Sequence, residues 1–207
     1  LFGAGLFGLM AGALIFGPLS DRLGRKPILI GSVVVFGIAS VFASFSPDLH
    51  SLIIWRFITG LGLGGALPNA ITLTSEYAPS SRRSNLVTMM FCGFTIGSAL
   101  GGILSAQLLP QIGWHGILLI GGVLPLITVP ILYFLLPESL RFLVLKNKSR
   151  EKIEKIVQRI APHITVQPNL IPTVNEVEKS SFKDLFVKGY ALGTILIWCT
   201  FFMSLLI

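Results

Sequence analysis

The sequence predicts an all-α, polytopic membrane protein, and three observations carry this prediction. Hydrophobic residues make up 53% of the 207 residues and charged residues only 12%, whereas a soluble domain carries about 25% charge. Five apolar runs are each close to the roughly 20 residues that a helix needs to cross a bilayer, and all but one of the Lys and Arg residues fall outside these runs. The runs cover residues 1–19, 27–46, 50–75, 84–108 and 116–136, and a sixth begins near residue 189.

The first two runs are joined by a short burst of charge at residues 17–26, Gly-Pro-Leu-Ser-Asp-Arg-Leu-Gly-Arg-Lys. Neither flanking run contains an ionisable side chain. Two membrane-spanning helices connected in this way place the charges at one surface of the membrane. We therefore expect residues 17–26 to form a tight charged loop.

The third run contains Arg56, five or six residues inside its start. An ionised arginine near the bilayer centre costs about 2.5–3.5 kcal/mol on insertion scales, so such a residue usually faces a cavity or a partner. Helical periodicity places Thr59, Gly60 and Leu63 on the Arg56 side, where small and polar residues let a helix or a ligand approach. The alternative is that Arg56 lies close enough to the outer boundary to snorkel.

The fourth and fifth runs belong to one stretch, residues 84–137, without Asp, Glu, Lys or Arg. Because it is far too long for one crossing, we expect a turn at residues 109–116, where proline and glycine cluster. Gly93, Gly97 and Gly101 recur every four residues and predict a groove in which helix backbones pack closely. The same spacing is also typical of a helix dimerisation face.

The long segment after the fifth run marks the predicted domain boundary. We expect residues 1–143 to form an N-terminal transmembrane bundle, and residues 188–207 to begin a C-terminal bundle. Residues 144–187 are predicted to be a cytoplasmic central loop with a basic amphipathic helix on the membrane surface. Both ends of the chain fall inside apolar runs, so we expect the sequence to be a fragment.

The positive charges predict the orientation in the membrane. Fifteen of the sixteen Lys and Arg residues lie in the connections 20–27, 76–84 and 137–188, and the connections 46–50 and 109–116 have none. Cytoplasmic connections carry an excess of Lys and Arg, so the three basic segments are predicted to face the cytoplasm. The net charge of +7 thus fits membrane orientation rather than nucleic-acid binding, which needs a clustered basic surface.

Together these features resemble the major facilitator superfamily of secondary transporters. Residues 17–26 match the signature between its second and third helices, and Arg56 with the glycines that follow it matches its fourth-helix pattern. Residues 137–143, Pro-Glu-Ser-Leu-Arg-Phe-Leu, are similar to a sequence after the sixth helix, with Leu140 and Phe142 in place of Pro and Trp. The resemblance implies helices two to six and the start of helix seven, with the first helix absent.

A narrower resemblance, to the aromatic acid:proton symporters, rests on residues 64–77, Arg82 with Arg83, and residues 90–94. Residues 193–206 are similar to the seventh helix of that family. The resemblance implies a secondary active transporter in a bacterial cytoplasmic (inner) membrane that imports an aromatic or related organic acid by proton symport and alternating access. It also implies that the carboxylates that carry the proton lie outside this chain.

Two groups of residues are candidates for the transport mechanism. The first lies on the cytoplasmic side, where two half-transporters would meet and where an acid such as Asp21 would cap a helix or pair with a cation. This gating group comprises Gly17, Asp21, Arg22, Gly24, Arg25, Lys26, Glu76, Arg82, Glu138 and Arg141. The second group would bind the substrate or couple it to the proton. It comprises Arg56 as the cation, Phe91 and Phe94 as ring contacts, and Asn69 and Thr95 as hydroxyl contacts. The alternatives are solvated loop charges and aromatic residues that only pack or face lipid.

Other functions fit the sequence less well. A membrane-embedded enzyme needs a metal cluster or a nucleophile with its base, but His50, His115 and His163 are isolated, so no metal and no cofactor is predicted. Cys92 and Cys199 each lie in an apolar run, where we expect buried free thiols. A receptor or structural bundle would not explain residues 17–26. A superfamily transporter of a sugar or other organic ion is the main alternative. The expected partners are a small organic acid, protons, membrane lipid and the missing helices of the same transporter, without nucleic acid.

Overall fold

The computed structural model describes residues 1–79, 81–145 and 196. The chain divides into two compact units, Leu1–Val166 and Gln167–Ile207, and the fold below is that of the first unit. All the regular structure of its described residues is helical. The predicted amphipathic helix, the sixth apolar run and Cys199 lie outside the described residues.

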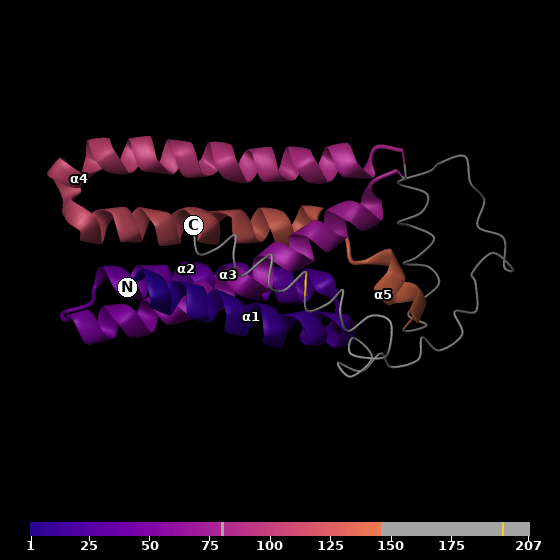
Figure 1. Cartoon of the computed structure of the whole chain (residues 1–207), viewed down its shortest axis with the longest axis horizontal. Helices are drawn as coiled ribbons and strands as arrows, with labels where there is room; N and C mark the ends of the chain where they lie inside the picture. Colours follow the sequence, from indigo (N-terminus) through magenta and orange to yellow (C-terminus); the bar gives the residue numbers. More distant parts are fainter. Residues whose placement is uncertain (80, 146–195, 197–207) are drawn as a thin grey trace, which may run out of the picture. The chain divides into compact units, whose positions relative to one another are not determined.

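The described part of the first unit consists of four long helices and one short helix (Figure 1). They are α1 (Phe2–Leu23), α2 (Arg25–Ser44), α3 (Leu49–Tyr77), α4 (Arg83–Leu135) and α5 (Leu140–Leu145). The four long helices are all long and apolar enough to cross a membrane. Their bounds agree with the predicted runs to within a few residues, because the length of an apolar run sets the length of a spanning helix.

The longest helix, α4, is two membrane crossings joined at a sharp bend. Its 53 residues are more than twice the roughly 20 needed for one crossing. Gly113 has φ 66° and ψ 179°, so the helix folds back there and its two arms run side by side in opposite directions (Figure 1). The break predicted within residues 109–116 is therefore confirmed, and the described helices make the five predicted crossings.

The charged segment 17–26 is not the tight loop that the sequence predicts. α1 continues to Leu23 despite Pro18, and α2 begins at Arg25, so Gly24 alone separates the two helices. Gly24 has φ 110°, in the left-handed region where a residue without Cβ is favoured. The loop prediction was wrong because one glycine of positive φ reverses the chain, and the charges lie in the adjoining helical turns.

α1 and α3 pack backbone against backbone through glycines. A Cβ added at Gly8 would lie 2.0 Å from the Phe57 carbonyl oxygen, and one added at Gly60 would lie 2.0 Å from the Gly5 carbonyl oxygen. Such distances leave no room for any side chain, as in the small-residue interfaces of membrane helices. The position of α1 against α3 therefore depends on these glycines.

The glycines that the sequence singled out in the fourth run lie in open space. A Cβ at Gly93, Gly97 or Gly101 would meet nothing within 4 Å, and most residues of this first arm of α4, 83–112, are exposed. The described helices therefore do not use the predicted groove. Cys92 on the same arm is a free, exposed thiol. The prediction that this thiol is buried is therefore wrong within the described part of the chain.

α2 lies between α3 and the second arm of α4 and contacts both. The Ser40 hydroxyl donates a hydrogen bond to the Leu118 carbonyl at 3.0 Å, which joins α2 to α4. The rings of Phe42 and Trp55 stack with centroids 4.9 Å apart, which joins α2 to α3. Together with the packing of α1 on α3, these contacts place α1, α2, α3 and the second arm of α4 around a common space.

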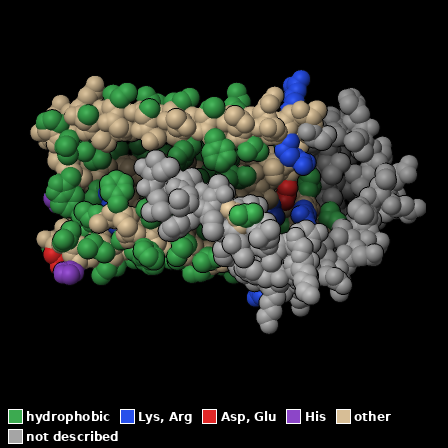
Figure 2. Space-filling model, viewed as in Figure 1, with side chains coloured by type: hydrophobic (Ala, Val, Ile, Leu, Met, Phe, Trp, Pro, Cys, Tyr) green, Lys and Arg blue, Asp and Glu red, His purple; other side chains and the backbone are tan. Residues whose placement is uncertain are grey.

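The two ends of the helices differ in charge. Figure 2 shows hydrophobic side chains along the helices and most of the visible Lys and Arg side chains gathered at one end. The connection at Gly24 meets residue Glu138 at this end, whereas the bend at Gly113 lies at the other. The alternation of connections with and without Lys and Arg that the sequence predicts is thus confirmed for the described part of the chain.

Candidate functional site

A mostly apolar cavity of about 720 Å³ opens between α1, α2, α3 and the second arm of α4. Its walls include the aromatic rings of Phe2, Phe36 and Trp114 together with leucine and isoleucine side chains. The cavity lies within helices that are apolar enough to span a membrane. It can therefore take an apolar group out of water.

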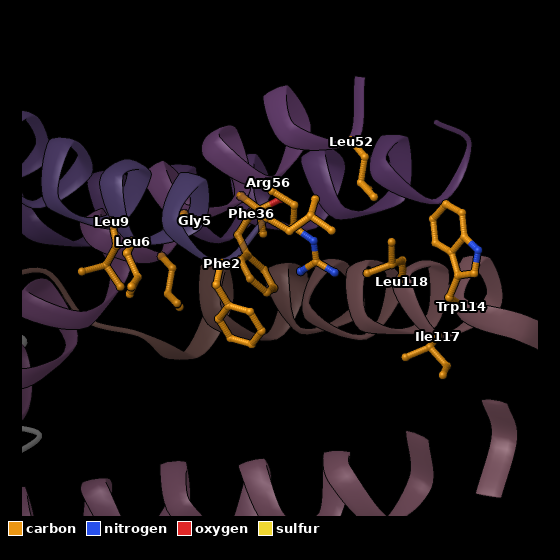
Figure 3. A pocket seen from close by; sticks show the side chains of 14 residues that line it. Phe2, Gly5, Leu6, Leu9, Phe36, Leu52, Arg56, Trp114, Ile117 and Leu118 are labelled. Atoms are coloured by element: carbon orange, nitrogen blue, oxygen red, sulfur yellow. The ribbon is translucent and has the colours of Figure 1, made fainter. Parts of the chain in front are cut away.

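Arg56 is the one charged residue among the described residues that line the cavity. Figure 3 shows its guanidinium extended into the cavity, with Phe2 and Phe36 on one side and Leu118 and Trp114 on the other. No carboxylate of the described residues lies within ion-pair distance of it. A cation in such surroundings favours an anion as its partner.

The turn of α3 that carries Arg56 is held by its neighbours. The Thr59 hydroxyl donates to the Trp55 carbonyl at 2.7 Å, and the Trp55 ring stacks on Phe42 of α2. One turn later, Gly60 is in backbone contact with Gly5 of α1. The guanidinium therefore projects from a rigid segment, which favours a defined binding geometry.

The other predicted substrate contacts lie elsewhere. Asn69 is buried, and its Nδ2 donates to the Gly65 carbonyl of the same helix at 2.8 Å. Phe91, Phe94 and Thr95 are exposed on the first arm of α4. None of these four residues is part of the cavity lining around Arg56, so the structure does not bring the substrate group together.

A second candidate site lies at the charged end, where Arg25 and Glu76 form a mostly buried ion pair. Arg25 Nη1 lies 2.8 Å from Glu76 Oε1, and the two side chains are 14% and 15% exposed. Asp21 approaches the same guanidinium only at 3.5 Å and is 71% exposed. The structure thus brings these three predicted residues together, with very different degrees of burial.

Glu138 caps the N-terminus of α2 from a distant part of the chain. Its Oε1 accepts hydrogen bonds from the backbone N–H groups of Arg25 at 2.9 Å, Lys26 at 3.1 Å and Ser139 at 2.9 Å. The first N–H groups of a helix have no partner within the helix, and a carboxylate is favoured at its positive end. Gly24 allows this approach, because a Cβ there would lie 2.6 Å from Glu138 Oε2.

Three residues that sequence reasoning missed complete this cluster. The Ser139 hydroxyl donates to Glu76 Oε2 at 2.6 Å and accepts from the Phe142 N–H at 3.1 Å. The Tyr77 hydroxyl donates to the Glu138 carbonyl, and Lys26 Nζ donates to the carbonyl of Tyr133 at 2.7 Å. Ser139 carried a usable signal, because a serine before an apolar helix is a preferred N-cap. The two tyrosines carried none.

Four members of the predicted gating group stay outside the cluster. Arg22, Arg82 and Arg141 are exposed, and none forms an ion pair with another described residue. Gly17 lies inside α1, where its carbonyl accepts a hydrogen bond from the Ser20 hydroxyl at 2.7 Å. Their predicted role in gating stays a prediction.

Comparison with known proteins places the chain in a family. The model of the Major Facilitator Superfamily matches residues 1–207. The chain is 47% identical to the 4-hydroxybenzoate transporter PcaK of Pseudomonas putida and 42% identical to a gallate transporter of Pseudomonas putida, in each case over 99% of the chain and 46% of the relative. The chain thus spans about half the length of these relatives. They are named as transporters, which points to transport rather than to an enzyme.

The fold agrees with this assignment. A partially occluded, inward-open structure of the xylose transporter XylE from E. coli matches with a TM-score of 0.68 and 26% identity, over 76% of this chain and 42% of that one. The predicted all-α fold is therefore confirmed. So is the predicted resemblance to transporters of aromatic acids, since the two relatives carry the names of such acids.

Proposed function

The chain belongs to the Major Facilitator Superfamily, and from this premise we propose that it is part of a secondary transporter in a bacterial inner membrane that imports an aromatic or related organic acid with protons. The names of the two relatives, a 4-hydroxybenzoate and a gallate transporter, support this class of substrate. 4-Hydroxybenzoate and gallate are both ring compounds with one carboxylate. Such a substrate offers an anion and a flat apolar surface to its binding site.

The observation that carries the proposal is Arg56 in an apolar cavity within the membrane-spanning helices. Opposite unit charges about 4 Å apart attract by about 4 kcal/mol at an effective dielectric constant near 20. This attraction offsets the about 2.5–3.5 kcal/mol that an ionised arginine costs at the bilayer centre, although the anion must also be taken out of water. An anionic partner therefore makes the position of Arg56 far less costly than an unpaired charge.

Two anions fit the role, and they lead to different behaviour. One is the carboxylate of the substrate, with Phe36 and Trp114 as flat surfaces for its ring. The other is a carboxylate of the same transporter that takes up and releases the coupled proton. In the first case Arg56 determines affinity, and in the second it determines the coupling of uptake to the pH gradient.

Binding of 4-hydroxybenzoate and of its neutral amide to the full-length protein that contains this chain tests the first role. We expect the acid to bind and the amide to bind far more weakly. Arg56→Gln should weaken the binding of the acid by about 100-fold, since a lost ion pair of about 3 kcal/mol corresponds to two powers of ten. Arg56→Lys should recover part of it, and Arg83→Gln, an exposed arginine at the start of α4, is the matched control.

Uptake driven by a pH gradient tests the second role in the same variants. If Arg56→Gln binds the acid like the wild type but no longer accumulates it, Arg56 serves the proton. Wild-type binding together with wild-type accumulation in both Arg56 variants would refute both roles. Accumulation of D-xylose in place of ring acids would favour the alternative of a sugar transporter, which the likeness to XylE raises.

A further inference from the structure

A second cavity, of about 440 Å³, lies beside the cavity that holds Arg56. Phe36 of α2 and Leu63 of α3 line both cavities, so these two side chains form a shared wall. An acid with a single ring, bound at Arg56, leaves the second cavity unused. The second cavity is therefore an adjoining space, separated from the first by the side chains of Phe36 and Leu63.

The two cavities follow one another along the bundle. On α3 the lining of the first cavity ends at Leu63, and that of the second runs from Leu63 to Ala66. On the second arm of α4 the lining advances in the same direction, from Trp114 in the first cavity to Thr128 in the second. Because a helix rises about 1.5 Å per residue, Leu63 lies about 10 Å and Ala66 about 15 Å along α3 from Arg56. An acid with one ring is shorter than this rise, and a second ring in line with the first would reach the shared wall.

The backbone of Phe36 is held from two sides. A Cβ added at Gly62 of α3 would lie 2.6 Å from the amide nitrogen of Phe36. A Cβ added at Gly122 of α4 would lie 2.7 Å from the carbonyl oxygen of Gly37, the residue after Phe36. Backbone contacts of this closeness fix α2 against both of its neighbours. The half-buried side chain of Phe36 therefore sets how far the first cavity extends.

The second cavity suits an uncharged, apolar group. No Asp, Glu, Lys, Arg or His lines it in the part of the chain that the structure describes. The hydroxyl of Thr128, a polar group in its wall, already donates to the Pro125 carbonyl of the same helix at 2.7 Å. A charged substituent would find no partner in this cavity, which is unfavourable, whereas the burial of an apolar ring is favourable.

We propose that the second cavity is a subsite for an apolar extension of the ring acid, and that Phe36 decides whether an acid long enough to enter it is accepted. The inference rests on the proposed function, since it places the carboxylate of the acid at Arg56. With Phe36 present, the protein prefers acids with one ring, such as 4-hydroxybenzoate. Without the Phe36 ring the two cavities join, and an acid with two rings in line occupies both. Phe36 is thus a specificity-determining residue.

Binding of 4-hydroxybenzoate and of 4-phenylbenzoate to the full-length protein that contains this chain, measured by calorimetry, tests the subsite. Phe36→Ala should strengthen the binding of 4-phenylbenzoate by at least about 10-fold relative to that of 4-hydroxybenzoate, which corresponds to about 1.4 kcal/mol. Burial of an apolar group the size of a phenylalanine side chain contributes at least this much. Phe2→Ala is the matched control, because Phe2 lines the Arg56 cavity but not the second one, and it should bring no such gain.

Two further variants distinguish the subsite from a general widening of the site. Ala66 lines only the second cavity, so Ala66→Phe, added to Phe36→Ala, should fill that cavity and remove the gain. Leu63→Ala shortens the other side chain of the shared wall and should change the preference in the same direction, which keeps the test decisive if Phe36→Ala does not fold. A two-ring acid with a carboxylate on each ring should show no gain in Phe36→Ala, because its second carboxylate would enter an uncharged cavity.

No gain for 4-phenylbenzoate in Phe36→Ala and Leu63→Ala, or an equal gain in Phe2→Ala, would overturn the proposal. So would an equal gain for the acid with two carboxylates, since the opening would then lead to water. If the wild type binds 4-hydroxybenzoate while the gain is absent, the proposed function stands and the subsite alone is refuted. If neither the wild type nor any variant binds either acid, the proposed function fails and the subsite fails with it.

Discussion

Replacing Gly8 by alanine would insert a methyl group into the backbone contact between α1 and α3. The new Cβ would lie 2.0 Å from the Phe57 carbonyl oxygen, whereas ordinary contact begins near 3.4 Å. The two helices would have to separate by about 1.4 Å at this point, because a backbone carbonyl cannot rotate away as a side chain can. Separation of that size removes close contacts along the whole interface.

We expect Gly8→Ala to cost about 3 kcal/mol of folding free energy, at the upper end of typical overpacking costs. For a domain of this size, each kcal/mol lowers the melting temperature by about 2–4 °C, so a decrease of roughly 10 °C is predicted. Far-ultraviolet circular dichroism of the purified full-length protein in detergent, recorded during heating, measures it. The same displacement should disturb Arg56, since the turn that follows it contacts Gly5.

Gly31→Ala is the matched control for this prediction. Gly31 is an exposed glycine of α2, and a Cβ there would meet nothing within 4 Å. Alanine in a helix interior is favoured over glycine by roughly 0.5–1 kcal/mol, so the melting temperature should stay unchanged or rise slightly. Equal melting temperatures for Gly8→Ala and the wild type would refute the close packing of α1 on α3. So would an equal decrease in melting temperature for Gly8→Ala and Gly31→Ala.

Three further substitutions test the connections between helices. Gly24→Ala should lower the melting temperature by several degrees, because a φ of 110° costs an alanine about 1–3 kcal/mol and its Cβ would crowd Glu138; unchanged melting would exclude the single-residue turn. Gly113→Ala should destabilise the bend of α4 for the same backbone reason and increase protease cleavage there, and unaltered cleavage would contradict the bend. Asp48 caps the N-terminus of α3: the Ser51 N–H donates a hydrogen bond to its carboxylate, which holds the pKa of Asp48 below its ordinary value of 3.8. The stability that Asp48 contributes is therefore present above pH 3.8 and lost as the pH falls through the lowered pKa. Asp48→Ala should remove this dependence of stability on pH. An unaltered profile of stability against pH would contradict the cap.

The membrane crossings could be predicted from the sequence because each depends on a local property. The length of an apolar run sets the length of a helix, and clustered glycine and proline between 109 and 116 located the bend at Gly113. The distribution of Lys and Arg predicted which connections share a side. These signals need no knowledge of neighbouring helices.

The interior of the site could not be predicted, because it depends on contacts between distant residues. Glu138 reaches the amide of Arg25 across 113 positions. The sequence placed both residues in one gating group, but nothing near either of them indicates that Glu138 caps the N-terminus of α2. Likewise, the spacing of Gly93, Gly97 and Gly101 resembles a packed face, yet a Cβ there would meet nothing within 4 Å, whereas Gly8 and Gly12 of α1 pack closely against the backbone of α3. Spacing shows that a glycine face exists, but only the fold decides which helix covers it.

Accumulation of 4-hydroxybenzoate in proteoliposomes that hold the full-length protein tests the central claim most directly. With the interior more alkaline than the exterior, we predict uptake well above that of protein-free liposomes. Uptake by the protein-free liposomes measures the passive entry of the weak acid. A protonophore should abolish this excess, and Arg56→Gln should not show it. Equal uptake with and without protein, or an excess that persists without a pH gradient, would contradict proton-coupled import through the Arg56 cavity.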